Sequence, residues 1–432
     1  MLGRAQRAAH GGGGRDSDSE AEAEAKADAR APGGAGGPSP VRRLPALTAM
    51  TGRDPEEAHR ASTPLELLFD LCFVVAVSQA AAELHHSLAE GRTGAGVLGY
   101  AMVFFAIWWA WMNFTWFASS YDTDDVLYRV LTLLQMAGVL VLAAGVPQAL
   151  THYDFAQVTA GYVVMRLAMV AQWLRAARQH PAGRRAALRY AAGITLVQIG
   201  WLLRLLLPAQ YGLIGFAVLV VAELAVPAWA EARGRQTPWH PGHIAERYGL
   251  FTIIVLGEVI LATTTGIHSA VSAHGLSATL LLITVGALLL VFTLWWSYFS
   301  GAEATFASLR TALTWGYGHY AVFASVAALG AGLDVAVQAA EHRAHVPETG
   351  AAFAVAVPVA LFLLLLAPVH GLTRTGAMAY HWLTAAGAAV VLAIAAAGHA
   401  LGIGAAVLCM GLTTSLLLTV NLVAQHRSSS AD

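Results

Sequence analysis

Ionisable side chains lie inside stretches of this chain that are otherwise almost wholly apolar. Asp70 and Glu258 lie well inside two such stretches, and Arg166 lies in the middle of a third. A charged group is costly at the centre of a lipid bilayer, so it usually faces the interior of a helix bundle and a partner there. One interpretation is a path for a proton or cation through Asp70 and Glu258, with Arg166 as counter-charge. The other is structural pairing, of Arg166 with Glu258 or Glu223, which fixes the helix register.

A second set of charges lies where two apolar stretches begin. Glu66 precedes Asp70 by four residues, which places both on one face of a helix. Arg247 precedes Glu258 by eleven residues, or three helical turns, and so lies on nearly the same face. Acidic groups near a helix N-terminus complement the helix dipole. A structural role is therefore favoured for Glu66, Glu246 and Arg247.

Three potential metal ligands recur every three residues at His240, His243 and Glu246. The dipeptide Pro241-Gly242 interrupts any helix between the two histidines, and the spacing differs from the His-Glu-x-x-His pattern of zinc proteases. A loop that leads into a helix explains the cluster equally well. We therefore expect no metal, no cofactor and no enzymatic activity. An intramembrane enzyme that uses this cluster is kept as an alternative.

The composition indicates which environment these residues occupy. Hydrophobic residues make up 57% of the 432 residues and charged residues 12%, with a mean hydropathy of +0.58. Soluble proteins carry roughly 25% charged residues, so the chain belongs in a bilayer. A formal net charge of −1 argues against a nucleic-acid partner, which would require a basic surface. The expected partners are the lipid bilayer and an unknown small solute or ion, and the oligomeric state is not set by the sequence.

The apolar stretches predict an all-α fold, a bundle of about twelve transmembrane helices, because about 20 apolar residues cross the hydrocarbon core. The expected segments are 64–87, 95–118, 126–149, 155–178, 186–207, 211–231, 244–266, 276–300, 312–339, 350–371, 378–399 and 401–425. Residues 1–62, rich in Gly, Ala and acidic side chains, are expected to form a disordered cytoplasmic tail, and residues 428–432 a short one.

Arginine residues predict the orientation. With the N-terminus inside, the connections on that side hold many arginines, whereas the outer connections hold Arg92 and Arg343. This bias predicts a multi-pass membrane protein with both termini in the cytoplasm.

A weak internal similarity predicts two parallel six-helix repeats. Asp122 and Arg129 follow the second segment as Glu303 and Arg310 follow the eighth, at the same offset. The repeats would span residues 63–231 and 232–427.

Aromatic residues cluster in the second segment, between Trp108 and Tyr121. These side chains could form a cage around a ligand, but a belt of aromatic residues at the membrane interface is the favoured interpretation.

Three motifs are similar to those of a known family. Residues 63–74 (TPLELLFDLCFV) resemble the opening PLELFFDLVFV of the bacterial low temperature requirement protein A (LtrA) family, with Leu68 and Cys72 as departures. Residues 243–258 (HIAERYGLFTIIVLGE) resemble its HxxERxGLxxIIxLGE, and Tyr162 with Arg166 resembles its Y-x-x-x-R. The resemblance covers about residues 60 to 425 and implies a polytopic inner-membrane protein without an established biochemical activity. It places six of the charges above in the family's own motifs: Glu66, Asp70, Arg166, Glu246, Arg247 and Glu258.

The favoured function is an ion- or proton-linked transporter or a channel-like protein. The alternative is a non-transporting membrane scaffold or a sensor of membrane state. A transporter requires a water-accessible cavity that reaches Glu258, whereas a scaffold requires Glu258 and Arg166 paired in a dry core. An enzyme requires His240 and His243 to converge on a pocket.

Overall fold

The computed structural model describes residues 47–57, 60–232, 236–300, 306, 308–372 and 378–429. Of the segment expected to be disordered, residues 1–46, 58 and 59 lie outside the described part. Residues 47–57 and 60–62 are described and pack on helix ends. Of the expected C-terminal tail, residues 430–432 lie outside the described part.

The described residues form an all-helical fold with twelve long helices, one for each predicted segment. The all-α prediction is therefore confirmed. The long helices are α2 (Pro64–Ala89), α3 (Thr93–Tyr121), α4 (Val126–His152), α5 (Ala156–Gln179), α6 (Arg184–Arg204), α7 (Ala209–Glu231), α8 (Pro241–His274), α9 (Ala278–Phe299), α10 (Leu309–Ala340), α11 (Glu348–Gly371), α12 (Met378–Ala396) and α14 (Ile403–Ser429). Two single turns, η2 (Pro181–Gly183) and α13 (Gly398–Leu401), connect neighbours.

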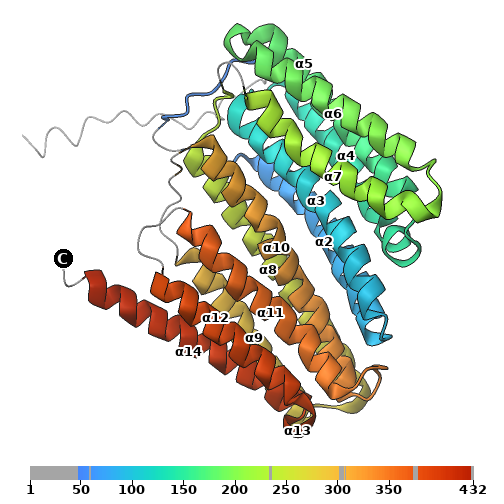
Figure 1. Ribbon diagram of the computed structural model, residues 1–432, viewed down its shortest axis with the longest axis vertical. Helices are drawn as coiled ribbons and strands as arrows, with labels where there is room; N and C mark the ends of the chain where they lie inside the picture. Colours follow the sequence, from blue (N-terminus) through green and yellow to red (C-terminus); the bar gives the residue numbers. More distant parts are fainter. Residues whose placement is uncertain are drawn as a thin grey trace, which may run out of the picture. The chain divides into compact units, whose positions relative to one another are not determined.

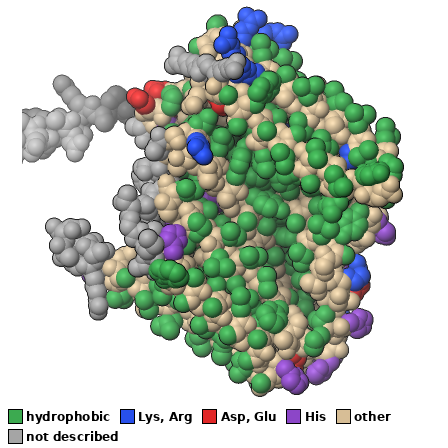
Figure 2. Space-filling view, in the orientation of Figure 1, with side chains coloured by type: hydrophobic (Ala, Val, Ile, Leu, Met, Phe, Trp, Pro, Cys, Tyr) green, Lys and Arg blue, Asp and Glu red, His purple; other side chains and the backbone are tan. Residues whose placement is uncertain are grey.

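Ten of these helices are long and apolar enough to cross a bilayer. The other two long helices are α5, which carries Arg166, Arg175 and Arg178, and α12, whose apolar part His381–Ala396 is short. Hydrophobic side chains cover much of the visible face of the bundle (Figure 2). The bundle is therefore a multi-pass membrane protein, and its surface contacts lipid.

Local sequence explains where the helices begin. Thr63 accepts a hydrogen bond from the backbone N–H of Glu66, and the Glu66 side chain accepts one from the backbone N–H of Thr63, which forms a capping box before α2. Asp125, Ser277 and Ser308 cap α4, α9 and α10 in the simpler way, through one side-chain oxygen. These caps satisfy backbone N–H groups that the first turn leaves without a helical partner.

Helices α2, α3, α8 and α10 lie centrally between two other groups (Figure 1). On one flank lie α4 to α7, and on the other lie α9, α11, α12 and α14. Helix α2 packs against α3, α4, α8 and α10, so it joins the two halves of the chain.

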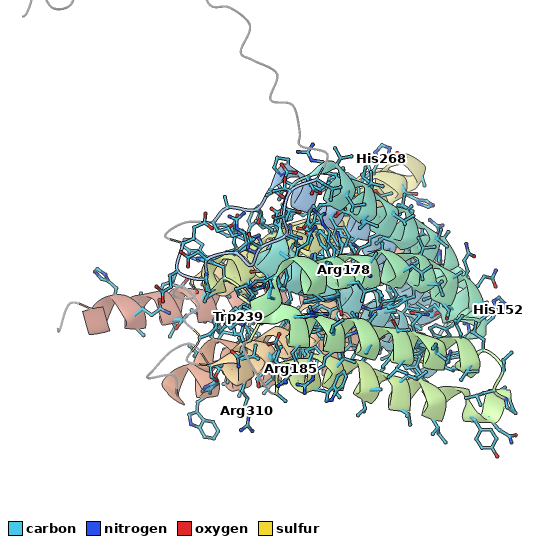
Figure 3. The ribbon with its side chains drawn as sticks, turned by 90° about the horizontal axis from the view of Figure 1, so that it is seen from above. His152, Arg178, Arg185, Trp239, His268 and Arg310 are labelled. Carbon is cyan, nitrogen blue, oxygen red and sulfur yellow. The ribbon has the colours of Figure 1, made fainter. Side chains whose placement is uncertain are left out.

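The two ends of the bundle differ in charge. Arg310 lies toward the end where α10 begins, and His152 and His268 lie toward the opposite end (Figure 3). We call these the arginine-rich end, which also holds Arg178 and Arg185, and the histidine-rich end, which also holds His274 and His345.

The order of packing is alike in the two halves. The first helix of each half packs on the second and third, the third on the fourth, and the fourth on the fifth. One difference is that α9 packs extensively along α14, a contact that α3 and α7 do not match. A duplicated unit would produce such a shared order, and the six-plus-six repeat stays a prediction.

The interpretation of the α3 aromatics as an interface belt is wrong. Trp108, Trp109 and Trp111 are at most 1% exposed, and Phe114 and Phe117 are fully buried. Helix α3 is enclosed by its neighbours along most of its length, so its aromatic rings fill the interior of the bundle. A run of aromatic residues in one helix does not distinguish a belt from a core, because both are apolar.

A close approach of α10 and α11 depends on Gly332. A Cβ atom there would lie 2.1 Å from the carbonyl oxygen of Ala354, which is backbone and cannot turn aside. We expect Gly332→Ala to destabilise the protein by roughly 1–3 kcal/mol, as overpacking usually does. Thermal unfolding in detergent measures the change. Gly212→Ala in α7, where a Cβ would meet no atom within 4 Å, is the matched control. Equal unfolding temperatures for the two variants would contradict the packing of α10 on α11.

Candidate functional site

A polar cavity of about 420 Å³ lies between α2, α8 and α10 toward the histidine-rich end. Each helix contributes residues at helical spacing, so one face of each points into it. The lining comprises Ser78, Ala81, Ala82 and His85 of α2; Glu258, Leu261, Ala262, Thr265, Gly266 and Ser269 of α8; and Ala331, Asp334, Val337 and Gln338 of α10, with Glu341 and Arg343 after it. Most of the apolar members are small, which leaves the space open.

Glu258 is a deeply buried carboxylate of this cavity. The residue is only 5% exposed, and its Oε1 atom accepts a hydrogen bond of 2.8 Å from the Ser78 hydroxyl. Its Oε2 atom has no hydrogen-bond partner among the described residues. Glu258 therefore lines the cavity without a cationic partner among the described residues, unlike Asp70 and Glu223.

Asp334 reaches into the cavity from α10. A Cβ atom at Gly266 would lie 2.6 Å from its Oδ1 atom, so the glycine leaves room for this carboxylate against α8. That Oδ1 atom also has no hydrogen-bond partner among the described residues.

Charge is balanced at the mouth of the cavity. Glu341 lies 3.2 Å from Arg343 and 3.0 Å from Nδ1 of His274. The Arg343 side chain is 56% exposed, which marks the solvent side of the cavity.

Apolar residues fill the level between Glu258 and the arginine-rich end. Phe73 and Val77 of α2 and Phe251 and Val255 of α8 are all fully buried. This packed level separates the cavity from a second charged centre.

The second centre is an ion pair between α2 and α8. Nη2 of Arg247 lies 2.5 Å from Oδ1 of Asp70, which also accepts a 2.7 Å hydrogen bond from the indole N–H of Trp111. Asp70 and Arg247 are both fully buried. Nε and Nη1 of Arg247 and Oδ2 of Asp70 have no hydrogen-bond partner in the described part of the chain. The charges cancel, but much of their hydrogen-bonding capacity is unused.

The remaining charges at the helix starts have structural contacts. Oε1 of Glu66 lies 3.1 Å from Nε2 of His243, and its other oxygen serves the capping box. Glu246 accepts a hydrogen bond of 3.1 Å from the backbone N–H of Ser62. Together these contacts bind the start of α2 to the start of α8.

The segment before α2 covers the arginine-rich end. The backbone N–H of Thr48 donates to Asp125 at 2.7 Å, and that of Met50 donates to Gln179 at 2.8 Å. Arg175 donates both to Asp125 and to the carbonyl oxygen of Thr48. Thr48 and Met50 are thus bound to the start of α4 and to α5, and the backbone N–H of Arg53 donates to the carbonyl oxygen of Ser120 in α3.

Two acids at this end have shifted pKa values. Burial, reinforced by the charge of Glu66, raises the pKa of Asp122 to about 6. Burial acts in the same direction on Asp125, but hydrogen bonds from Arg175 and from the backbone of Thr48 and Tyr128 outweigh it and lower the pKa of Asp125.

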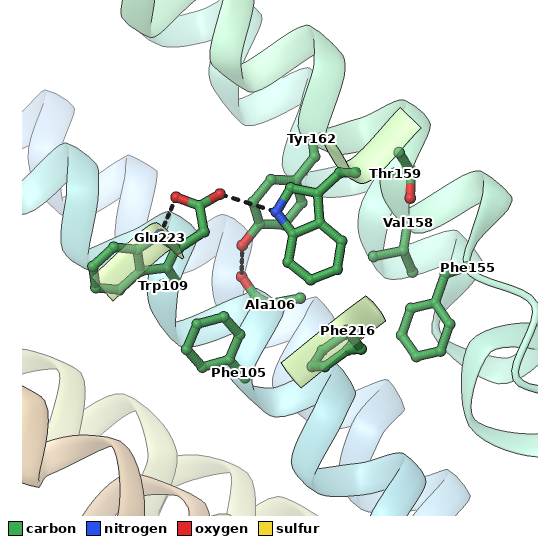
Figure 4. A pocket seen from close by; sticks show the side chains of 10 residues that line it. Phe105, Ala106, Trp109, Phe155, Val158, Thr159, Tyr162, Phe216 and Glu223 are labelled. Atoms are coloured by element: carbon green, nitrogen blue, oxygen red, sulfur yellow. Dashed lines mark hydrogen bonds between the residues drawn. The ribbon is translucent and has the colours of Figure 1, made fainter. Parts of the chain in front are cut away.

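Arg166 lies in a different place from Asp70 and Glu258. Its Nη2 atom lies 3.3 Å from Glu223 of α7, and its guanidinium lies over the Tyr162 ring. Indole N–H groups of Trp109 and Trp201 donate to the same carboxylate at 2.7 and 3.1 Å (Figure 4). Arg166 thus has Glu223 as its partner, and Arg247 holds the position beside Asp70.

The histidines do not converge. Nδ1 of His240 accepts a hydrogen bond from the backbone N–H of His243 as the cap of α8, and Nε2 of His240 lies 2.8 Å from the carbonyl oxygen of Glu57. Among the described residues no group of three or more His, Cys, Asp or Glu side chains could hold a metal ion.

Comparison with known proteins identifies the family. A model of the family "Bacterial low temperature requirement A protein (LtrA)" matches residues 61–422, most of the chain. The chain belongs to the LtrA family. It is also 30% identical over 252 residues to an uncharacterized protein of Rhizobium meliloti (strain 1021). That alignment covers 56% of this chain and 59% of the relative, so it spans less than two thirds of the relative. The LtrA motifs quoted above contain both Asp70 and Arg247, and the fold joins them.

The Asp70–Arg247 pair predicts strongly non-additive substitutions. We expect Asp70→Asn to destabilise the protein by roughly 3–5 kcal/mol, because it leaves the Arg247 charge buried without a partner. Arg247→Gln in addition removes that charge, so the double variant unfolds at a higher temperature than Asp70→Asn alone. Thermal unfolding of the single and double variants in detergent measures the coupling. Additive losses would mean that the two side chains do not interact.

Proposed function

We propose that this LtrA protein transports a proton or a small cation across the membrane along α2, α8 and α10. One observation carries the proposal: the 420 Å³ polar cavity reaches Glu258, a buried carboxylate without a cationic partner. Such residues inside membrane helices commonly mark ion or proton pathways.

The contacts of Arg166 support transport over a scaffold for this region. A purely structural Glu258 would pair with Arg166 in a dry core, whereas Arg166 has Glu223 as its partner. The contacts of His240 and His243 also disfavour an enzyme that uses these histidines, because both side chains stabilise the start of α8.

The cavity and the packed level together fit one state of an alternating-access cycle. The cavity is open toward the histidine-rich end, and Phe73, Val77, Phe251 and Val255 separate it from the Asp70–Arg247 pair. In the proposed cycle α2 moves relative to α8, and Asp70 and Arg247 then take part at the arginine-rich end. The arginine bias favours an orientation with that end in the cytoplasm of a bacterium, so that the cavity faces outward.

The scaffold alternative rests on the Asp70–Arg247 pair itself. It joins the first helix of one half to the first helix of the other, and such a bond also suits a protein that holds helices together.

Flux in liposomes tests the proposal. Purified protein is reconstituted, and proton and alkali-cation fluxes are followed with ion-sensitive dyes. We expect flux that falls at least tenfold in Glu258→Gln, because the substitution removes a deeply buried charge of the cavity. Glu90→Gln is the matched control, since Glu90 lies in the exposed turn at the same end and pairs with Arg92.

Thermal unfolding verifies that both variants are folded. Flux that is equal in Glu258→Gln and wild type would contradict the proposed path. Absence of proton and cation flux in the wild type would favour the scaffold alternative.

A further inference from the structure

We infer that the inner part of the cavity, at Glu258 and Ser78, binds a monovalent alkali cation that retains part of its water shell. This inference rests on the proposed function and deepens it, because it names the class of ion that occupies the path.

One carboxylate oxygen of Glu258 has no hydrogen-bond partner among the described residues. Glu258 lines the cavity and is 95% buried. Its other carboxylate oxygen is bonded to Ser78, and the unpartnered oxygen is buried. Leaving a buried charged oxygen without a partner is costly. A cation or a proton within the cavity removes that cost.

The donor chemistry favours a hard cation. The cavity offers carboxylates from Glu258 and Asp334 and hydroxyls from Ser78, Thr265 and Ser269. Oxygen ligands of this kind suit alkali and alkaline-earth ions rather than soft metals.

Two further observations narrow the class to small monovalent ions. At Ser78 the cavity offers the single carboxylate of Glu258, whose one negative charge is balanced by one monovalent cation, whereas a divalent ion there would leave a positive charge unbalanced. No described lining residue is Phe, Tyr or Trp, so the cavity lacks the aromatic faces that recognise quaternary ammonium groups.

The size of the cavity indicates partial hydration. A volume of 420 Å³ holds on the order of ten water molecules at about 30 Å³ each. A cation therefore enters with water and exchanges part of its shell for Glu258 and Ser78.

Asp334 provides a position nearer the mouth. Its carboxylate lies beside Gly266, eight residues after Glu258 and therefore about 12 Å further along α8. The other titratable groups that line the cavity are His85 from α2 and the paired Glu341 and Arg343. Asp334 thus lies between the mouth and Glu258, where it attracts the entering ion.

Binding is measured on the full-length protein in detergent, without flux. Thermal unfolding is followed at pH 8 in increasing NaCl or KCl, with N-methyl-D-glucamine chloride keeping the ionic strength constant. An ion that binds only the folded protein raises the unfolding temperature saturably. We expect such a rise in wild type and in Glu90→Gln, and an apparent affinity at least tenfold weaker in Glu258→Gln.

If Glu258→Gln does not fold, a second variant tests whether the alkali cation binds at Glu258 and Ser78. Ser78→Ala removes the hydroxyl that holds Glu258, and we expect a several-fold weaker affinity. An equal response to alkali and N-methyl-D-glucamine salts would overturn the inference, as would an undiminished response in the folded Glu258→Gln or in Ser78→Ala.

The two proposals fail in different ways. Saturable alkali-cation binding without flux in liposomes supports the site and overturns transport. Proton flux through a protein that shows no saturable cation response overturns the alkali-cation site and leaves transport standing.

Discussion

Every charge placed inside a bilayer needs a partner, and this requirement organises the interior of the protein. Asp70 is paired with Arg247, Glu223 with Arg166, and Asp125, at the membrane boundary, with Arg175. Each pair joins two helices, because a charge cannot be neutralised by apolar neighbours on its own helix. The pair Asp70–Arg247 matters most for the architecture. It joins α2 to α8, so it binds the first half of the chain to the second at a fully buried position.

Glu258 and Asp334 depart from this rule, and their surroundings explain how they can. Alanines and a glycine make up much of the lining between α2, α8 and α10. Their side chains are too small to fill the space between the three helices. The resulting cavity lies beside the two carboxylates, and in the function that we propose water and ions enter it in place of a fixed arginine. Bulky residues return one level further in, at Phe73 and Phe251, and separate the cavity from the Asp70–Arg247 pair. The function that we propose depends on an open cavity at Glu258 followed by a closely packed level at Phe73 and Phe251.

The helices were predictable because the bilayer sets their length, and each of the twelve predicted segments is one helix. The sequence was less informative about which charged residues pair between different helices. Spacing along one helix shows that Arg247 and Glu258 share a face, but it does not show which helix that face meets. Arg166 was therefore predicted either as the counter-charge of the path through Asp70 and Glu258 or as the structural partner of Glu258 or Glu223, and the structure pairs it with Glu223. The location of the aromatic residues of α3 was predicted wrongly for a similar reason. Apolar character alone does not show whether a side chain faces lipid or the protein interior. Gly266 gave no signal without the three-dimensional contact to Asp334.

In the function that we propose, water reaches the level of Glu258 from one side of the membrane and no further. Cysteine accessibility measures this directly, after Cys72 and Cys409 are replaced by Ser. Ala262→Cys lies in the cavity and Val255→Cys at the packed level. We expect a membrane-impermeant thiol reagent to modify Ala262→Cys from the outside of the cell only, and Val255→Cys from neither side. An unreactive Ala262→Cys on both sides, in a folded protein, would contradict the proposal.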